Sequence, residues 1–277
     1  MTAIITRVAY VDWTKGFERH WNGGNAAVSH VFNALSFLFP QGEKYFIDVA
    51  REVARGIDLT GRPNLAEELG AFVAQEAIHT RQHEQYNAVL EQLGYKNVVH
   101  DYIERIVELT RHHLSPLTNL AMVCAYEHYT AILGNFVLSN PQVLAPALPD
   151  LALVWGWHAA EETEHKAVCF DLYRAAGGGW LRRVLAFSLV TLNFWTMFLR
   201  AYFHLLRRDG CLNPSRLPRT LAQSLRFFFG APGLVWDLIG HGIPYLTPWF
   251  HPSDYDNQRK LQSWLAANGS RLRVVGQ

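Results

Sequence analysis

The chain has few charged residues for its length, and neither sign dominates. Lysine, arginine, aspartate and glutamate make up 18% of the 277 residues, and the formal net charge is +1. This composition indicates neither a basic surface of the kind that binds nucleic acid nor an acidic tail. We therefore expect no nucleic-acid partner. Hydrophobic residues make up 49% of the chain, which is enough for a large core.

Cysteine is scarce as well. The three cysteines, Cys124, Cys169 and Cys211, have no metal-type spacing, and an odd number argues against a disulfide framework. Reduced thiols in an intracellular protein are the simpler interpretation. The first residues, MTAIITRVAYVDWTKG, lack an apolar run followed by a small-residue cleavage site. We therefore expect no secretory signal and a cytoplasmic location.

Strand-like alternation, internal repeats and low-complexity tracts are also missing. Apolar residues instead recur at helical spacing between turn signals, which predicts an all-α fold. The predicted helices cover residues 43–57, 64–93, 98–113, 115–139 and 151–176. Pro40 to Gly42 is a turn signal that separates a short apolar helix from the helix starting at Glu43. Asn64 is the expected N-cap of the next helix, with Glu67 completing a capping box.

Four glutamates and two histidines follow a regular order along these helices. In chain order they are Glu43, Glu76, His79, Glu127, Glu162 and His165. Residues three apart share a helix face, so each Glu-x-x-His pair can bind one ion. The order Glu, Glu-x-x-His, Glu, Glu-x-x-His is the ligand order of ferritin-like di-iron carboxylate bundles. The pattern therefore predicts a ferritin-like four-helix bundle that holds two metal ions.

The charges of the set support the same interpretation. Four carboxylates balance two divalent ions, whereas four buried acids without metal would be costly. Glu127 is the most telling member, because it lies in the almost wholly apolar segment AMVCAYEHYTAILGNFVL. The alternative for Glu127 is a buried acid paired with an arginine or a tyrosine. The alternative for Glu43 is a carboxylate at a helix start, favoured by the helix dipole.

Two more histidines lie one helical turn from the pairs. His83 follows His79 by four residues, and His158 precedes Glu162 by four. They are candidate catalytic residues and candidate metal ligands, or groups that orient a ligand. A buried, hydrogen-bonded histidine without a function is the alternative for each.

The last third of the chain has a different composition. Residues 184–199 carry no charge, but sixteen residues are short of the roughly 20 that span a bilayer. The segment is interpreted as a helix covering the bundle, a helix lying on a membrane, or a true span. We divide the chain into a metal-binding bundle with its N-terminal segment, residues 1–179, and an apolar helical extension, residues 180–277. Membrane contact through residues 180–250 would place the protein at the periphery of the inner membrane.

At these motifs the chain resembles the bacterial family described as predicted metal-dependent hydrolases. The resemblance runs from about residue 30 to 265. It is carried by FPQGEKYFIDVAREV, FVAQEAIHTRQHEQYN, AYEHYTAIL, WGWHAAEETEHKAVCFDLY and WFHPSDYDN. Members of this family are similar to ferritin-like proteins in fold. The metal residues that the resemblance implies are Glu43, Glu76, His79, His83, Glu127, His158, Glu162 and His165.

Two chemistries suit such a site. Its many oxygen donors favour iron, with manganese or zinc as alternatives. With iron we expect a di-iron oxidoreductase that uses O₂ to oxidise a hydrophobic small molecule and needs an electron donor. The alternative is a dinuclear metal-dependent hydrolase. A non-catalytic metal-binding protein ranks third. The apolar extension favours a hydrophobic or lipid-like substrate, and a homodimer is a further expectation.

Overall fold

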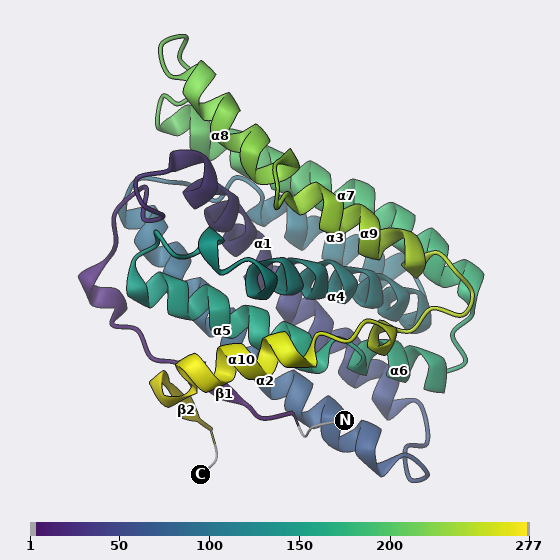
Figure 1. Cartoon of the computed structure of the whole chain (residues 1–277). Helices are drawn as coiled ribbons and strands as arrows, with labels where there is room; N and C mark the ends of the chain where they lie inside the picture. Colours follow the sequence, from purple (N-terminus) through teal and green to yellow (C-terminus); the bar gives the residue numbers. More distant parts are fainter. Residues whose placement is uncertain (1–3, 276–277) are drawn as a thin grey trace.

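The fold consists of helices apart from one very short sheet (Figure 1). The computed structural model describes residues 4–275. The helices are α1 (Ala26–Arg55), α2 (Pro63–Gln92), α3 (His100–His113), α4 (Pro116–Ser139), α5 (Pro149–His165), α6 (Val168–Ala175), α7 (Trp180–Arg208), α8 (Leu217–Phe229), α9 (Leu234–Tyr245) and α10 (Gln258–Asn268). The prediction of an all-α fold is confirmed.

The one sheet joins the two ends of the described chain. Strand β1 (Arg7–Ala9) pairs antiparallel with β2 (Leu272–Val274), and Arg7 lies opposite Val274. The sequence did not reveal these strands, since three residues are too few for a visible alternation.

Four long helices form the centre of the molecule. α1 packs against α2, α4 packs against α5, and the two pairs meet through contacts of α1 with α4 and of α2 with α5. A single large apolar cluster fills the space between them and continues onto α7. This arrangement places the inward faces of all four helices around one volume.

α1 is continuous where the sequence predicted a turn, so that prediction was wrong. Pro40 lies inside the helix, and its ring removes the hydrogen bond that the Ser36 carbonyl would receive. Asn87 of α2 compensates, because its Nδ2 donates to the Ser36 carbonyl at 2.8 Å. Asn97 donates to the Phe37 carbonyl at 3.0 Å in the same way. Side chains distant in sequence thus keep the helix intact past the proline.

Of the other predicted helices, one starts a residue earlier than predicted, one starts where it was predicted to, and one is divided in two. α2 starts at Pro63 after Arg62, one residue before the predicted cap Asn64. α4 starts after Ser115, whose hydroxyl accepts from the Thr118 amide at 3.2 Å, as predicted. The predicted helix 151–176 is two helices, because α5 ends at His165 before α6 starts.

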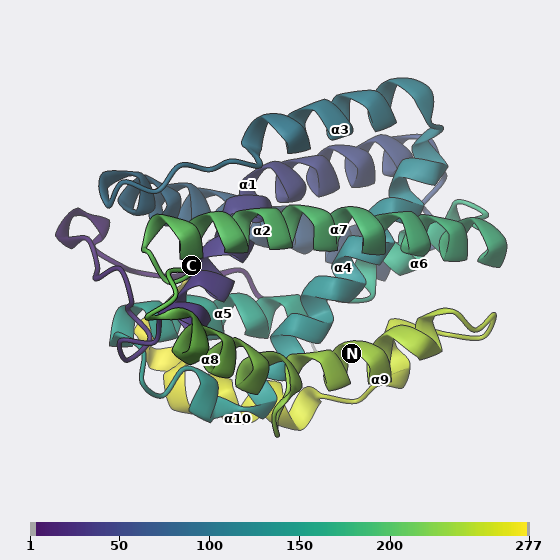
Figure 2. The same cartoon turned by 90° about the horizontal axis from the view of Figure 1, so that it is seen from above.

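The apolar part of the chain forms a layer on the bundle. α7 packs on α1 and α4, and α8 and α9 lie beside it (Figures 1 and 2). Within the described residues, α7 is the one helix long and apolar enough to cross a membrane. Only 39% of its most apolar window is buried in the fold. The boundary at residue 180 falls between α6 and α7, and the division into two domains stays a prediction.

Candidate metal centre

The four central helices bring all eight predicted residues into one buried cluster, which we call the core cluster. Each of its members is 4% exposed or less. α1 supplies Glu43, α2 supplies Glu76, His79 and His83, α4 supplies Glu127, and α5 supplies His158, Glu162 and His165. Residues that are far apart in the sequence thus lie on the inward faces of four neighbouring helices.

One half of the core cluster surrounds His165. Its Nε2 lies 3.2 Å from Glu76 Oε1, 3.5 Å from Glu127 Oε2 and 3.3 Å from Glu162 Oε2. The four residues each offer one ligand atom, and these atoms lie within 4.8 Å of one another. That spacing suits a single small cation at the centre of the four donors.

The other half surrounds His79. Its Nδ1 lies 3.7 Å from Glu76 Oε1 and 3.6 Å from Glu162 Oε1. Glu43, Glu76 and His79 form one group of close donors, and His79, His158 and Glu162 form another. Glu76 and Glu162 therefore border both halves, as two carboxylates between neighbouring cations would.

The outer nitrogens of two histidines are held by residues that the sequence did not single out as orienting groups. His79 Nε2 is 3.0 Å from Glu161 Oε2, and His165 Nδ1 is 2.9 Å from Gln75 Oε1. Each acceptor fixes the proton on the outer nitrogen and leaves the inner nitrogen free to bind a cation. Their position next to Glu162 and Glu76 in the motifs was the available signal.

Glu161 and Glu164 lie on the outer side of the cluster, where both also contact Arg7. Glu161 Oε1 accepts from the Arg7 amide at 2.8 Å, while Glu164 is paired with the Arg7 guanidinium at 2.9 Å. The strand β1 thus closes the outer side of the cluster.

A chain of hydrogen bonds sets the orientation of the second pair of histidines. Asn87 donates to the Ser36 carbonyl, so its Oδ1 faces the Ser36 hydroxyl and accepts from it at 2.8 Å. Ser36 Oγ then accepts from His83 Nδ1 at 2.9 Å, and His83 Nε2 accepts from His158 Nδ1 at 3.0 Å. His158 Nε2 is left without a proton, 3.1 Å from Glu162 Oε1. His83 therefore holds His158 with a free lone pair aimed into the cluster.

Several side-chain atoms of the core cluster that could bind a cation have no hydrogen-bond partner. Among the described residues, twelve buried side-chain nitrogen and oxygen atoms have no hydrogen-bond partner, and seven belong to this cluster. They are Glu43 Oε1, both Glu76 oxygens, His79 Nδ1, both Glu127 oxygens and His158 Nε2. Buried polar atoms without partners are rare and costly in proteins. These atoms fit metal ions, because carboxylate oxygens and imidazole nitrogens bind iron, manganese and zinc.

The acids also repel one another. Burial raises the pKa of Glu43 and of Glu127 well above the usual value, and the charge of Glu76 adds to both shifts. Positive charge placed among these carboxyls would therefore be strongly favourable.

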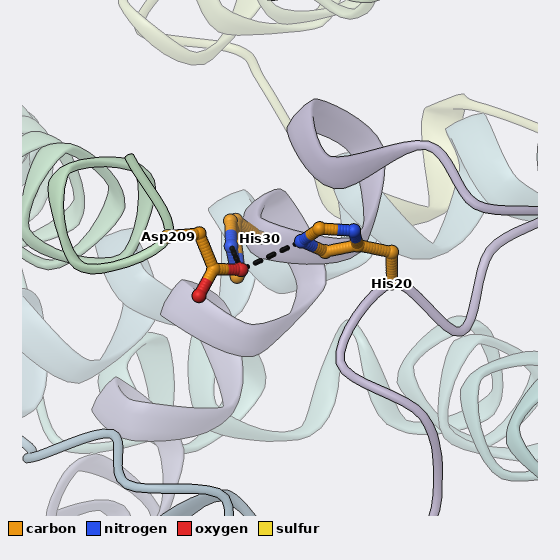
Figure 3. Close-up of side chains that lie close together, drawn as sticks. All are labelled: His20, His30 and Asp209. Carbon is orange, nitrogen blue, oxygen red and sulfur yellow. Dashed lines mark hydrogen bonds and ion pairs between the residues drawn. The ribbon is translucent and has the colours of Figure 1, made fainter. Parts of the chain in front are cut away.

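A second histidine–carboxylate group lies outside the core cluster, near the start of α1 and the end of α7. This outer cluster consists of His20, His30 and Asp209 (Figure 3). Asp209 Oδ2 accepts from His20 Nε2 at 2.6 Å, from His30 Nε2 at 3.0 Å and from the Tyr95 hydroxyl at 2.7 Å. Arg19 is paired with Asp209 Oδ1 at 3.0 Å. Both carboxylate oxygens therefore have partners within the protein.

The neighbours of His30 fix its protons as well. Trp21 and Tyr86 both donate to Asn33 Oδ1, at 2.9 and 2.6 Å, so the Asn33 amide nitrogen faces His30. That nitrogen donates to His30 Nδ1 at 3.2 Å. His30 Nε2 consequently carries its proton and donates a hydrogen bond to Asp209. The nitrogen that a metal would need is already occupied by a hydrogen bond.

A small apolar cavity borders the core cluster. Its volume is about 50 Å³, and it is lined by residues of α1, α3, α4, α5 and α7. Glu43 and Glu162 form its polar end, while Phe46, Ile106 and Met197 belong to its apolar walls. α3 is the outermost wall, and Ile103 is its one buried residue. An apolar group can therefore lie directly against two carboxylates of the cluster.

Fold and site together define an all-α protein with buried histidine and glutamate groups able to hold metal ions. The chain belongs to the family described as "Predicted metal-dependent hydrolase", whose model matches residues 6–256. Among curated proteins and among solved structures, no match to the chain was found. The family supports a metal-dependent enzyme and agrees with the resemblance seen in the motifs.

The family match corrects the principal functional prediction. O₂-dependent oxidation of a small molecule was expected, but the family is described as one of predicted metal-dependent hydrolases, which was the stated alternative. The sequence argument failed because it took the redox use of similar ligand orders as a guide to chemistry. The same donors bind non-redox cations equally well, so ligand order does not decide between the two reactions.

Proposed function

We propose that this protein is a hydrolase that binds two divalent cations in the core cluster, between helices of a ferritin-like bundle. The observation that carries the proposal is the set of seven buried donor atoms without hydrogen-bond partners, all facing one volume. Four glutamates in that volume match the charge of two divalent cations. The family description supports the hydrolytic chemistry.

The donor groups divide between two positions. Glu43, His79 and His158 belong to the first position, and Glu127 and His165 belong to the second. Glu76 and Glu162 have donor atoms near both positions, which suits bridging carboxylates. Iron, manganese and zinc all accept such a mixture of oxygen and nitrogen donors.

Three residues position the ligands. Glu161 and Gln75 hold the outer nitrogens of His79 and His165, while His83 holds His158. Fixed imidazole orientation raises metal affinity, because no rotamer freedom is lost on binding. His83 in turn is held by Ser36. The prediction that His83 is a catalytic residue or a metal ligand stays a prediction, since His83 also lies in a group of close donors with Glu43 and His158.

Two bound cations would polarise a scissile carbonyl or phosphoryl group and lower the pKa of water. The protein's own part is to exclude bulk water and to orient the substrate. The cavity beside Glu43 and Glu162 would receive a short apolar group of the substrate, with the scissile bond at its polar end. We therefore propose an ester with a short acyl chain as the simplest substrate.

Metal analysis combined with an ester assay tests the proposal. Protein stripped with chelator and reloaded with Mn²⁺, Fe²⁺ or Zn²⁺ is expected to contain two ions per chain and to hydrolyse p-nitrophenyl acetate or butyrate. The Glu127→Ala variant should lose both properties. Lys44 and Glu84 form an exposed ion pair on α1 and α2, so Glu84→Gln serves as the matched control and should behave as wild type.

Two outcomes would contradict the proposal. A protein loaded with two ions that hydrolyses none of these esters, nor bis-p-nitrophenyl phosphate, is not the hydrolase described. A Glu127→Ala variant with full metal content would remove Glu127 from the site.

A further inference from the structure

The outer face of α7 is apolar although no other element covers it. Leucine and phenylalanine side chains recur there at spacings of three, four or seven residues and are 40–70% exposed. The stripe consists of Leu181, Leu185, Leu189, Leu192, Leu199 and Phe203. The opposite face, with Phe194 and Phe198, is buried against the bundle. α7 is therefore apolar on both sides, which a helix that merely covers a soluble core does not need.

The two helices beside α7 continue this surface. Leu217, Leu221, Leu225 and Phe229 are exposed at a spacing of four residues along α8. Trp236, Ile239 and Ile243 are exposed on α9, and Trp249, in the loop that follows, is 79% exposed. The three helices lie together as one layer in both views (Figures 1 and 2). Exposed apolar area of this extent marks an interaction site.

An apolar groove runs between α7 and the α8–α9 pair. Its volume is about 560 Å³. Trp195 and Leu199 line it from α7, Phe229 from α8, and Ile239 and Ile243 from α9. The apolar surface is thus continuous across the layer and has space between its helices for chains that are themselves apolar.

The charges around this surface are mostly positive. Residues 180–245, which include α7, α8 and α9, contain eight arginines and two acids: Asp209, which the outer cluster buries, and Asp237 on α9, which is half-buried. Seven of these arginines are exposed: Arg182, Arg200, Arg207, Arg208, Arg216, Arg219 and Arg226. On α7 and α8, Arg182, Arg200 and Arg226 each follow an exposed leucine directly, so they flank the apolar stripes.

We propose that the face formed by α7, α8 and α9 docks on a lipid bilayer that contains anionic headgroups. Apolar side chains of this layer would enter the boundary between headgroups and acyl chains, while the arginines bind lipid phosphates. A second copy of the chain is the less suitable occupant. A two-fold interface would bring the arginines of both copies into one contact with few acids to pair with them. This inference is independent of the hydrolytic activity.

Vesicle co-sedimentation of the full-length protein tests the inference. Wild-type protein is expected to sediment with vesicles of phosphatidylcholine and phosphatidylglycerol, and less with pure phosphatidylcholine. Leu185→Ser/Leu189→Ser should lower the partition coefficient about tenfold. Its matched control is Ile5→Ser/Tyr10→Ser, which removes two exposed apolar side chains near β1, away from the layer, and should bind as wild type (Figure 1).

Charge reversal of two arginines measures the electrostatic contribution to vesicle binding. Arg219→Glu/Arg226→Glu is expected to weaken binding to the anionic vesicles at least about thirtyfold and to leave weak binding to neutral vesicles unchanged. Failure of wild-type protein to sediment with either vesicle would overturn the inference. So would a dimer in light scattering that Leu185→Ser/Leu189→Ser converts to monomer, because the face would then bind a second copy.

Discussion

Two groups of histidines and carboxylates in this protein use similar residues in opposite ways. In the outer cluster, both oxygens of Asp209 accept hydrogen bonds, and Arg19 neutralises the charge. In the core cluster, glutamates face one another, and both oxygens of Glu76 and of Glu127 have no hydrogen-bond partner. The first arrangement is complete within the protein, whereas the second has donor atoms that could hold cations.

The difference shows what distinguishes a metal centre from a structural polar group. Both clusters contain donor atoms close enough to surround an ion, so distance between donors does not separate them. The clusters differ instead in whether each lone pair of a donor atom already accepts a hydrogen bond. His30 Nε2 carries a proton and donates a hydrogen bond to Asp209, whereas His158 Nε2 carries no proton and is aimed at Glu162. The hydrogen bonds of the surrounding residues decide which nitrogens are free.

Metal content gives the largest expected contrast between the clusters. Glu127→Gln keeps the size of the side chain but removes a charge from the core cluster, so the loaded protein should contain one ion or fewer instead of two. Asp209→Asn makes the same chemical change in the outer cluster and should leave the content at two. Elemental analysis by mass spectrometry measures both. An equal loss of metal in the two variants would show that the core cluster and the outer cluster do not differ in metal binding.

The stability of metal-free protein should change in opposite directions. Glu127→Leu removes a buried acid without a partner and is expected to raise the free energy of unfolding by about 1–3 kcal/mol in excess chelator. Asp209→Asn breaks charge-assisted hydrogen bonds to His20 and His30 and should lower it by about 2 kcal/mol. Urea denaturation followed by circular dichroism measures both. A destabilised Glu127→Leu protein would mean that Glu127 has a partner in the metal-free fold.

Glu161 should affect metal affinity without being a ligand. Glu161→Gln weakens the contact that orients His79, and metal affinity is expected to fall about 10–100-fold while two ions still bind at saturation. Competition with a chromogenic chelator measures the affinity, and Glu84→Gln is again the control. An unchanged affinity would show that His79 is oriented by packing alone.

The outer cluster predicts a smaller, pH-dependent effect. Burial alone would raise the pKa of Asp209, but hydrogen bonds from His20, His30 and Tyr95 more than offset it and lower that pKa well below the usual value. Arg19 faces the same carboxylate. A lowered pKa stabilises the fold above the unfolded-state pKa of about 4, and the stabilisation disappears as the pH falls.

The destabilisation caused by Asp209→Asn should therefore shrink between about pH 5 and pH 3. Urea denaturation of both proteins across this range, in excess chelator, gives the difference in free energy of unfolding. A difference that stays constant over the range would contradict the assignment of charge to Asp209.

The sequence predicted the helical fold and the convergence of the core residues because both depend on local periodicity. A Glu-x-x-His spacing places two side chains on one face whatever surrounds the helix. The continuity of α1 through Pro40 was not predictable in this way, because it depends on Asn87 and Asn97. These contacts join residues far apart in the chain.

The orienting residues and the chemistry were missed for related reasons. Glu161 and Gln75 act on histidines of a neighbouring helix, which no spacing within one helix reveals. The outer cluster joins residues 189 positions apart, His20 and Asp209. The reaction type was predicted wrongly because ligand identity restricts the metal more than it restricts the chemistry.

Anomalous diffraction from crystals loaded with Mn²⁺ or Zn²⁺ tests the central claim most directly. Two peaks are expected in the core cluster, one beside Glu43 and His79 and one beside Glu127 and His165, and none between His20, His30 and Asp209. A core cluster without a peak in loaded crystals, or a peak at Asp209 in its place, would contradict the account.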